Sequence, residues 1–376
     1  MGVEGLSKLV KPIREVKLQE FKGQTFAIDA LVELNRVFKG QVVLTNKAGE
    51  KTHHIHSLLS TILKLEGFGI KQIWVFDHDV SKEKDGDEHF KYKSATLAKR
   101  KAIKEKNKER LYIAQTNKTE MENRLAALNE EQKADVDGLF DGLEEEALNK
   151  EINTIQKRID SPQRKEINDL KYMLDTLGIE WVEAPVTFEG EAIAADLVKT
   201  GIANYAFTPD LDAIMYGSPY VIKRTGRGKD TKYFLYNLDQ TIEELDIGYE
   251  DLIKIGLCLG TDANPDGIKG IGIKTVLSKY TNAVDWNSAP FKELIQMFSR
   301  TFDINKLSFN NVGKPKFSND QQALLIDWLV EIQSFDRDRV KKQFSNALNF
   351  VKTGDIVNKT PNIEIDWDTI TAATKK

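Results

Sequence analysis

The chain has 376 residues, enough for one large domain or two small ones with a full hydrophobic core. Its 54 Lys and Arg residues nearly balance 58 Asp and Glu residues, so the net charge of -4 provides no global attraction to nucleic acid. The single cysteine, Cys258, excludes an internal disulfide framework, and the absence of a signal pattern and of an apolar run of about 18 residues predicts a soluble, intracellular protein.

Four short apolar runs alternate with segments of helical periodicity, and this alternation predicts an α/β fold with a central, mostly parallel sheet flanked by helices. The runs are TFAIDAL (25–31), IKQIWVFD (70–77), IEWVEAP (179–185) and IANYAFTPD (202–210). Three of them end at or near acids, namely Asp29, Asp77, and Asp210 with Asp212. Because open parallel sheets bind ligands outside the carboxyl ends of their strands, we expect these acids along one edge of the sheet.

Asp210 and Asp212 stand two residues apart where a buried strand is predicted to end. One Asp at such a place is explained by hydrogen bonds to the backbone of the turn. Two of them on extended backbone point to the same face and repel each other, which a divalent cation would relieve. The pair therefore indicates a metal site, although so short a pattern also arises by chance.

A long, strongly charged helical segment interrupts the α/β pattern from about residue 91 to residue 175. Its first part, KYKSATLAKRKAIKEKNKER, carries nine Lys or Arg against two Glu, whereas DVDGLFDGLEEEALNKE is acidic. The basic run fits either a solvated helix face or a surface that contacts phosphates. Its length and single sign favour the phosphate contact.

The second half of this insert repeats aliphatic residues at the spacing of a coiled-coil seam: Leu148, Ile152, Ile155 and Ile159. We expect an antiparallel helical hairpin in which Leu125 and Leu128 face this seam across a turn near residues 137–142.

Closely spaced glycines in GIKGIGIKT, residues 267–275, separate two segments of helical pattern. Glycine permits tight turns and close approach of another backbone. Amide groups at the start of the following helix can hold a phosphate, and Lys269 and Lys274 add positive charge. An ordinary turn between two helices has the same sequence pattern, so this segment indicates a phosphate-binding loop only in combination with the motifs around it.

Glu189 and Glu191 stand at the start of another predicted helix, where the helix dipole favours acids. Positions two apart do not share a face of a regular helix, so both side chains reach one site only from its irregular start. Together with the strand-end acids they make seven acids at element boundaries: Asp29, Asp77, Glu189, Glu191, Asp210, Asp212 and Asp262.

The motifs MGVEGLSKLV, AIDA, VFD, EGEA, TPDLDAIMYGSP and LGTD followed by GIKGIGIKT stand in the order typical of structure-specific 5′ nucleases. The chain thus resembles the flap endonuclease family, within the Rad2/XPG-like superfamily, over roughly residues 1 to 280. This resemblance implies a PIN-like 5′ nuclease fold with a helical arch insert over 78–175 and a helix-two-turn-helix motif over 250–290. We expect a single nuclease domain over 1–350 and a carboxyl-terminal tail over 351–376.

The resemblance also implies two Mg²⁺ ions held by the seven acids, with Mn²⁺ as a substitute, and K⁺ at the helix-two-turn-helix motif. We expect Asp77 and Glu191 at the catalytic metal, Asp29 holding waters, and the other four acids completing the pair. Lys93 and Arg100 of the arch are the expected catalytic contacts to the scissile phosphate. The other expected DNA-binding residues are Gly2, Lys99, Lys269, Gly270, Gly272 and Lys274.

By the same resemblance we expect a monomer that hydrolyses DNA at 5′ flaps or recessed 5′ ends in replication and repair. Its location would be the nucleus or another site of DNA replication in a eukaryote or virus, and otherwise the cytoplasm. The alternatives are a 5′-3′ exonuclease, a junction-resolving or RNA-directed relative, a noncatalytic DNA-binding scaffold, and a phosphatase with Asp210 as nucleophile. The scaffold leaves the clustered acids unneutralised, and the phosphatase gives the arm and the glycine-lysine loop no role.

The chain departs from the family pattern in its spacing near two of the acids. Two extra residues separate Pro185 from Glu189, and one extra residue before Gly270 makes Asp266 a competitor for the position of Asp262. The aromatic residue that stacks on a base in the family is absent after the first Asp, unless Phe38 replaces it.

Two further features concern possible partners and a second metal. No clear sliding-clamp peptide occurs in NIEIDWDTITAATKK, so recruitment by a clamp is not expected. The cluster His53, His54 and His56 suggests zinc, but it lacks a metalloprotease helix motif and a cysteine partner.

Overall fold

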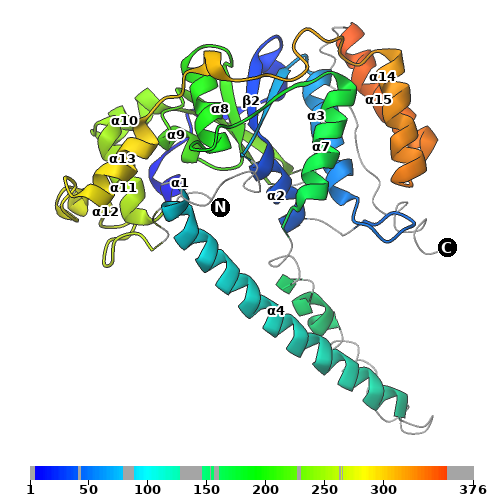
Figure 1. The fold of residues 1–376 in the computed structure, drawn as a ribbon, viewed down its shortest axis with the longest axis horizontal. Helices are drawn as coiled ribbons and strands as arrows, with labels where there is room; N and C mark the ends of the chain where they lie inside the picture. The colour runs from blue at the N-terminus through cyan, green and yellow to red at the C-terminus, as the bar shows by residue number, and fades with distance from the viewer. Residues whose placement is uncertain are drawn as a thin grey trace.

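The computed structural model describes residues 5–40, 44–78, 89–127, 146–152, 154–155, 161–226, 230–261, 264 and 266–353. These residues form a seven-stranded sheet covered by helices on both faces, with one long helix that projects away from the body (Figure 1). The predicted α/β class is confirmed.

The sheet has the strand order β1-β7-β6-β5-β2-β3-β4. Strands β6, β5, β2, β3 and β4 run parallel to one another, whereas β7 pairs antiparallel with both β6 and β1. Their bounds are Arg14–Val16 (β1), Thr25–Asp29 (β2), Lys71–Phe76 (β3), Glu180–Glu183 (β4), Tyr205–Thr208 (β5), Tyr220–Thr225 (β6) and Lys232–Asn237 (β7). The four strands predicted from apolar runs are β2, β3, β4 and β5; β1, β6 and β7 are additional.

Alternate residues of the central strands enter two separate cores, because successive side chains of a strand point to opposite faces. Phe26 and Ile28 of β2 and Trp74 of β3 belong to one core, whereas Ala27 and Val75 belong to the other. Both faces of these strands are therefore buried, which explains their nearly continuous apolar sequences.

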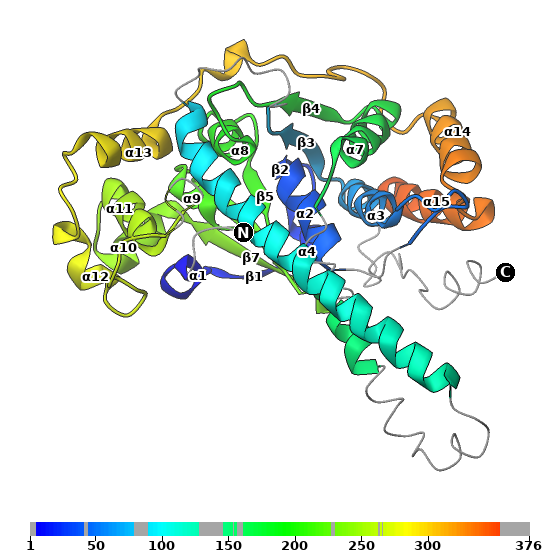
Figure 2. The same ribbon diagram turned by 60° about the horizontal axis from the view of Figure 1, so that its bottom comes forward.

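The helices of the body divide between the two cores. The first core packs against α2 (Ala30–Gly40), α3 (His53–Gly67), α7 (Arg164–Leu177), α14 (Asn319–Asp327), the π-helix Trp328–Ile332 and α15 (Arg337–Thr353). The second packs against α8 (Gly190–Lys199), α9 (Asp212–Met215), α10 (Leu238–Leu245), α11 (Tyr249–Leu259) and α13 (Ala289–Ser299). Figure 2 shows these two groups on opposite sides of the sheet. The remaining short elements are α1 (Leu6–Leu9), α12 (Val276–Lys279) and the 3-10 turns Leu18–Phe21, Tyr280–Asn282 and Ile304–Lys306.

The predicted arm is a projecting pair of helical segments. Its first helix, α4, runs over His89–Ala127 and leads away from the body in both views (Figures 1 and 2). Lys118 Nζ donates to Asn149 Oδ1 at 2.8 Å and Lys104 Nζ donates to Ser161 Oγ at 3.3 Å, so the returning segment runs antiparallel to α4.

Ile152 and Ile155 of the returning segment pack on Leu111 and Ala114 of α4. The predicted contact with Leu125 and Leu128 is not tested, because Leu128 and the side chain of Leu125 lie outside the described residues, as does the predicted turn. Among the helices of the described ranges, none combines the length and the apolar character needed to cross a membrane.

Candidate metal centre

Acids at the carboxyl ends of three strands lie at one edge of the sheet, as predicted. Asp29 is the last residue of β2, Asp77 follows β3 directly, and Asp210 and Asp212 follow β5. Strand β2 pairs in parallel with both β3 and β5, so the carboxyl ends of all three strands meet. Asp29 and Asp212 are buried, and Asp77 and Asp210 are half-buried.

The amino-terminal end of α8 meets these acids. Glu189 is the residue that precedes the helix, and Glu191 lies in its first turn. The backbone N–H of Gly190, between the two glutamates, donates to Asp77 Oδ1 at 2.6 Å. A Cβ atom at Gly190 would lie 3.1 Å from that oxygen, so a residue without a side chain is needed for this close approach. The irregular start of α8 therefore brings both glutamates and Asp77 to one place.

The electrostatics of Asp29 and Glu191 show that the acids at this edge of the sheet interact with one another. Burial raises the pKa of Asp29 well above its ordinary value, and the negative charges of Asp77, Glu189 and Asp210 raise it further. Burial likewise raises the pKa of Glu191, with further contributions from Asp212, Asp29, Asp210 and Glu189. Six of the seven predicted acids thus act on one another across the pocket.

A divalent cation fits this pocket, because carboxylate oxygens are the ligands that Mg²⁺ prefers and a cation relieves their mutual repulsion. Glu191 Oε1 is buried and receives no hydrogen bond from the described residues. Within the described ranges no three His, Cys, Asp or Glu side chains lie close enough together to enclose an ion directly.

Tyr216 is a neighbour of the acids that the sequence reasoning did not single out. Its hydroxyl donates to Glu189 Oε2 at 3.2 Å, and burial together with the charges of Glu189, Glu191 and Asp212 raises its pKa well above the ordinary value. The phenol therefore stays protonated and serves as a hydrogen-bond donor to Glu189. Its position in the quoted motif TPDLDAIMYGSP was the available signal.

Lys223 is a second neighbour that was missed, because it lies on β6, a strand that was not predicted. Burial lowers its pKa, and the charges of Asp210 and Asp212 oppose that change. A half-buried ammonium group thus lies on the β5 side of the pocket, where Lys223 pairs with Thr208 in the sheet.

Two of the predicted metal and DNA residues lie outside the described residues, namely Asp262 and Gly2. Asp266, the competitor of Asp262, is exposed on the turn that precedes Gly267. Lys93, Lys99 and Arg100 all lie within α4, but their side chains are outside the description. Lys93 and Arg100 are seven positions apart, which places them on one face of that helix.

The predicted glycine-lysine loop forms two successive turns between α11 and α12. Ile268 N–H donates to Cys258 O at 2.9 Å, Ile271 N–H to Ile268 O at 3.0 Å, and Val276 N–H to Gly272 O at 2.9 Å. Every predicted contact residue of the loop is exposed: Lys269, Gly270, Gly272 and Lys274. The loop therefore presents these residues to the solvent.

The histidine cluster and Phe38 belong to the core. His53, His54 and His56 are buried in α3, and His54 Nε2 lies 2.9 Å from Asp169 Oδ2. Burial lowers the pKa of His56 to about 4, so its ring is neutral at physiological pH. Phe38 is 5% exposed and contacts the ring of His53 edge-on, so it is not available to stack on a base.

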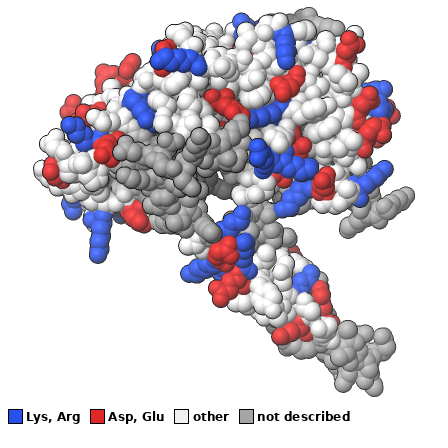
Figure 3. All heavy atoms as spheres, viewed as in Figure 1, with Lys and Arg blue, Asp and Glu red and all other residues white. Residues whose placement is uncertain are grey.

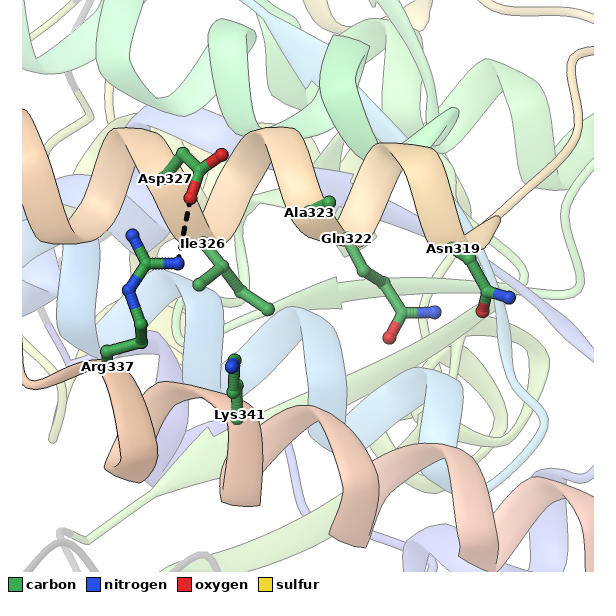
Figure 4. A pocket seen from close by; sticks show the side chains of 7 residues that line it. All are labelled: Asn319, Gln322, Ala323, Ile326, Asp327, Arg337 and Lys341. Carbon is green, nitrogen blue, oxygen red and sulfur yellow. Dashed lines mark hydrogen bonds and ion pairs between the residues drawn. The ribbon is translucent and has the colours of Figure 1, made fainter.

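A separate groove of about 380 Å³ lies between α14 and α15 (Figure 4). Its one acid, Asp327, is paired with Arg337 at 2.9 Å. The groove is lined by Asn319, Gln322, Ala323, Ile326, Asp327, Arg337 and Lys341. It lacks the clustered acids of the pocket at the sheet edge and does not resemble a metal centre.

Surface charge around the arm is mixed. Figure 3 shows Lys and Arg side chains gathered where the arm leaves the body, with acids among them. Lys108 pairs with Glu105 at 2.8 Å and Arg110 approaches Glu151 at 3.7 Å, so part of the basic run is neutralised within the arm. These exposed pairs contribute little to stability.

Comparison with known proteins gives two matching family models, the XPG N-terminal domain over residues 1–107 and the XPG I-region over residues 178–262. Flap endonuclease 1 from Methanocaldococcus jannaschii is 28% identical over 379 residues, which cover 97% of this chain and 99% of the relative. Flap endonuclease 1 from Pyrobaculum islandicum is 28% identical over 370 residues, which cover 91% of this chain and 94% of the relative.

Solved structures share the fold. Flap endonuclease-1 from Methanococcus jannaschii aligns with a TM-score of 0.65 at 23% identity, over 94% of this chain and all of that one. Human GEN1 in complex with Holliday junction DNA aligns with a TM-score of 0.59 at 17% identity, over 93% of this chain and 78% of that one.

The mixed sheet, the acids at its edge and the two family models define a metal-dependent nuclease of the Rad2/XPG class. Within this class the chain belongs to the flap endonuclease family.

Proposed function

We propose that this protein is a structure-specific 5′ nuclease that hydrolyses DNA at 5′ flaps or recessed 5′ ends, using two Mg²⁺ ions. The observation that carries the proposal is the convergence of carboxylates from β2, β3, β5 and α8 at one edge of the sheet, where burial and the neighbouring charges raise the pKa of Asp29 and Glu191. Such a pocket is costly in a metal-free protein and is relieved by divalent cations.

When bound, the two ions would supply a nucleophile at neutral pH and stabilise the attacking and leaving oxygens of an in-line displacement. In this proposal Asp77 and Glu191 hold the catalytic ion, and Glu189, Asp210, Asp212 and Asp262 complete the pair. Asp29 accepts a hydrogen bond from Val32 N–H at 2.8 Å, so one of its oxygens is fixed by α2 and the other can hold water. Mn²⁺ would replace Mg²⁺ because it accepts the same oxygen ligands.

The chain's own cations would bind and orient the DNA. Lys93 and Arg100, on one face of α4, would stabilise charge that develops on the phosphate, and Lys99 and Gly2 would contact the strand beside it. The exposed loop with Lys269, Gly270, Gly272 and Lys274 would grip the duplex through its phosphates, with K⁺ bound there. Because phosphate contacts carry no base information, recognition would be of DNA shape and not of sequence.

We also propose that residues 1–350 form one nuclease domain, with the arm over 78–175, the helix-two-turn-helix motif over 250–290 and a carboxyl-terminal tail over 351–376. The names of the structural neighbours, Rad2 with DNA substrate and GEN1 with a Holliday junction, support DNA as the ligand. We further propose a monomer at the intracellular site of DNA replication, without recruitment by a sliding clamp.

The test is to incubate the protein with Mg²⁺ and labelled 5′-flap, nicked, four-way-junction and single-stranded DNA. We expect cleavage near the base of the flap, no cleavage in EDTA, and a loss of at least about a hundredfold for Asp212→Ala. Absence of cleavage of every substrate would refute the nuclease proposal. Cleavage of the junction alone would replace the flap by the junction as substrate.

A further inference from the structure

The carboxyl-terminal end of α13 and the residues after it, 298–302, lie against the loop that carries Glu189. The Arg300 guanidinium donates from Nη2 to the carbonyl oxygen of Thr187, and its central carbon lies 4.1 Å from the centre of the Phe188 ring. Phe302 packs edge-on against the same ring at 5.1 Å. The segment therefore holds the two residues directly before Glu189 from outside.

The same segment is itself fixed to α8 and to Tyr216. Phe302 N–H donates to Asp196 Oδ2 at 2.7 Å, and Asp196 is 1% exposed within α8. The rings of Phe298 and Tyr216 lie 4.8 Å apart. Because Tyr216 donates to Glu189, segment 298–302 supports this glutamate both through the loop and through its hydrogen-bond donor.

The loop between β4 and α8 needs such support. It follows a turn in which Phe188 N–H donates to Pro185 O at 2.9 Å, and Thr187 is exposed. Glu189 stands outside the regular helix, as the residue that precedes α8, so α8 alone does not fix its direction. Arg300 also lies within electrostatic reach of Glu189 and Tyr216. Its positive charge thus stabilises the negative charge of Glu189.

We propose that Arg300 is a positioning residue that clamps residues 187–188 so that Glu189 faces the metal pocket. The proposal deepens the proposed function and rests on it, since it assumes that Glu189 takes part in metal binding. It assigns a role in the nuclease centre to the carboxyl-terminal part of the chain, more than a hundred residues from Glu189 in sequence. Groups that orient metal ligands change metal affinity by roughly ten- to a hundredfold when they are removed.

The test measures Mn²⁺ binding to the DNA-free protein by electron paramagnetic resonance, so that it does not depend on cleavage. Arg300→Met keeps an apolar stem over Phe188 but loses the charge and the hydrogen bond. We expect its Mn²⁺ dissociation constant to rise about tenfold, while Arg300→Lys, which keeps the charge, rises less. The Mg²⁺ concentration for half-maximal flap cleavage should rise by a similar factor.

Lys306→Met is the matched control, because Lys306 lies on the same stretch of chain, is exposed, and pairs with Asp303 at 3.6 Å. This control should bind Mn²⁺ as the wild-type protein does. Equal Mn²⁺ affinity of Arg300→Met and wild type would overturn the role of Arg300 while leaving the nuclease proposal intact. Failure of the wild-type protein to bind Mn²⁺ would overturn both. If Arg300→Met did not fold, Arg300→Gln, which also lacks the charge, would decide: unchanged affinity overturns the proposal and weakened affinity supports it.

Discussion

Replacing Gly190 by Ala is a small change that separates metal binding from stability. The new Cβ atom would lie 3.1 Å from Asp77 Oδ1 and 3.4 Å from Asp77 N, so the carboxylate must retreat by a few tenths of an ångström. That movement weakens the 2.6 Å bond from Gly190 N–H, and a bond to a charged group contributes about 1.5 to 3 kcal/mol. Loss of half of this contribution, about 0.75 to 1.5 kcal/mol, corresponds to a loss of about four- to twelvefold in metal affinity.

Folding should tolerate the same change, because Ala is favoured over Gly by up to about 1 kcal/mol in a helix. We expect Gly190→Ala to shift the free energy of unfolding in urea by less than about 1 kcal/mol and to need about tenfold more Mg²⁺ for half-maximal cleavage. Gly248→Ala is the control, since its Cβ atom would meet Asp251 Oδ2 at an ordinary 3.5 Å beside α11. Unchanged Mg²⁺ dependence of Gly190→Ala would show that the contact between Gly190 and Asp77 does not place a metal ligand.

Three further predictions concern the pocket and its surroundings. Tyr216→Phe removes the hydrogen bond to Glu189 and should weaken Mn²⁺ binding several-fold, and identical calorimetric titrations of variant and wild type would contradict this. The pKa values of Asp29 and Glu191 are raised in the folded protein, so their contribution to stability is present below their unfolded pKa and is lost as the pH rises through their folded pKa. Because the ionised carboxylates repel one another at high pH, Mg²⁺ should raise the melting temperature more at a pH of about 8 than at a pH of about 5. An equal rise at both pH values would refute that assignment. Glu33 is fully buried and pairs with Arg36 at 2.8 Å, so Glu33→Gln should lower the free energy of unfolding in urea by about 3 kcal/mol. Glu15 forms an exposed pair with Lys232, so the control Glu15→Gln should lower it by less than about 1 kcal/mol.

The parallel centre of the sheet could be predicted from sequence because its strands are buried on both faces. A short apolar run such as TFAID is best assigned as a buried strand. The acids at or near the ends of three of these runs mark the edge of the sheet where the strands have their carboxyl ends. The antiparallel strands β6 and β7 carry Lys, Arg and Tyr among their apolar residues, and β1 has three residues. A search for apolar runs therefore does not find these strands. Lys223 lies on β6, so it was not predicted either.

The convergence of the acids was predictable for the same reason, but the groups that hold them were not. Asp77 meets Gly190 across 113 positions of sequence, and Arg300 meets Thr187 across the same separation. Such contacts depend on how α8 and α13 pack on the sheet, and a local pattern does not contain that information. The burial of Phe38 could not be predicted from a local pattern either. Its position in the sequence allowed a role in base stacking, and its burial beside His53 excludes that role.

The acids at the sheet edge should bind two divalent cations. Crystals of the protein soaked in Mn²⁺ and measured at the manganese absorption edge test this binding most directly. We predict two anomalous peaks about 3.5 to 4 Å apart between Asp77, Glu191 and Asp212. A pocket without manganese, or peaks only beside the buried histidines of α3, would contradict the account.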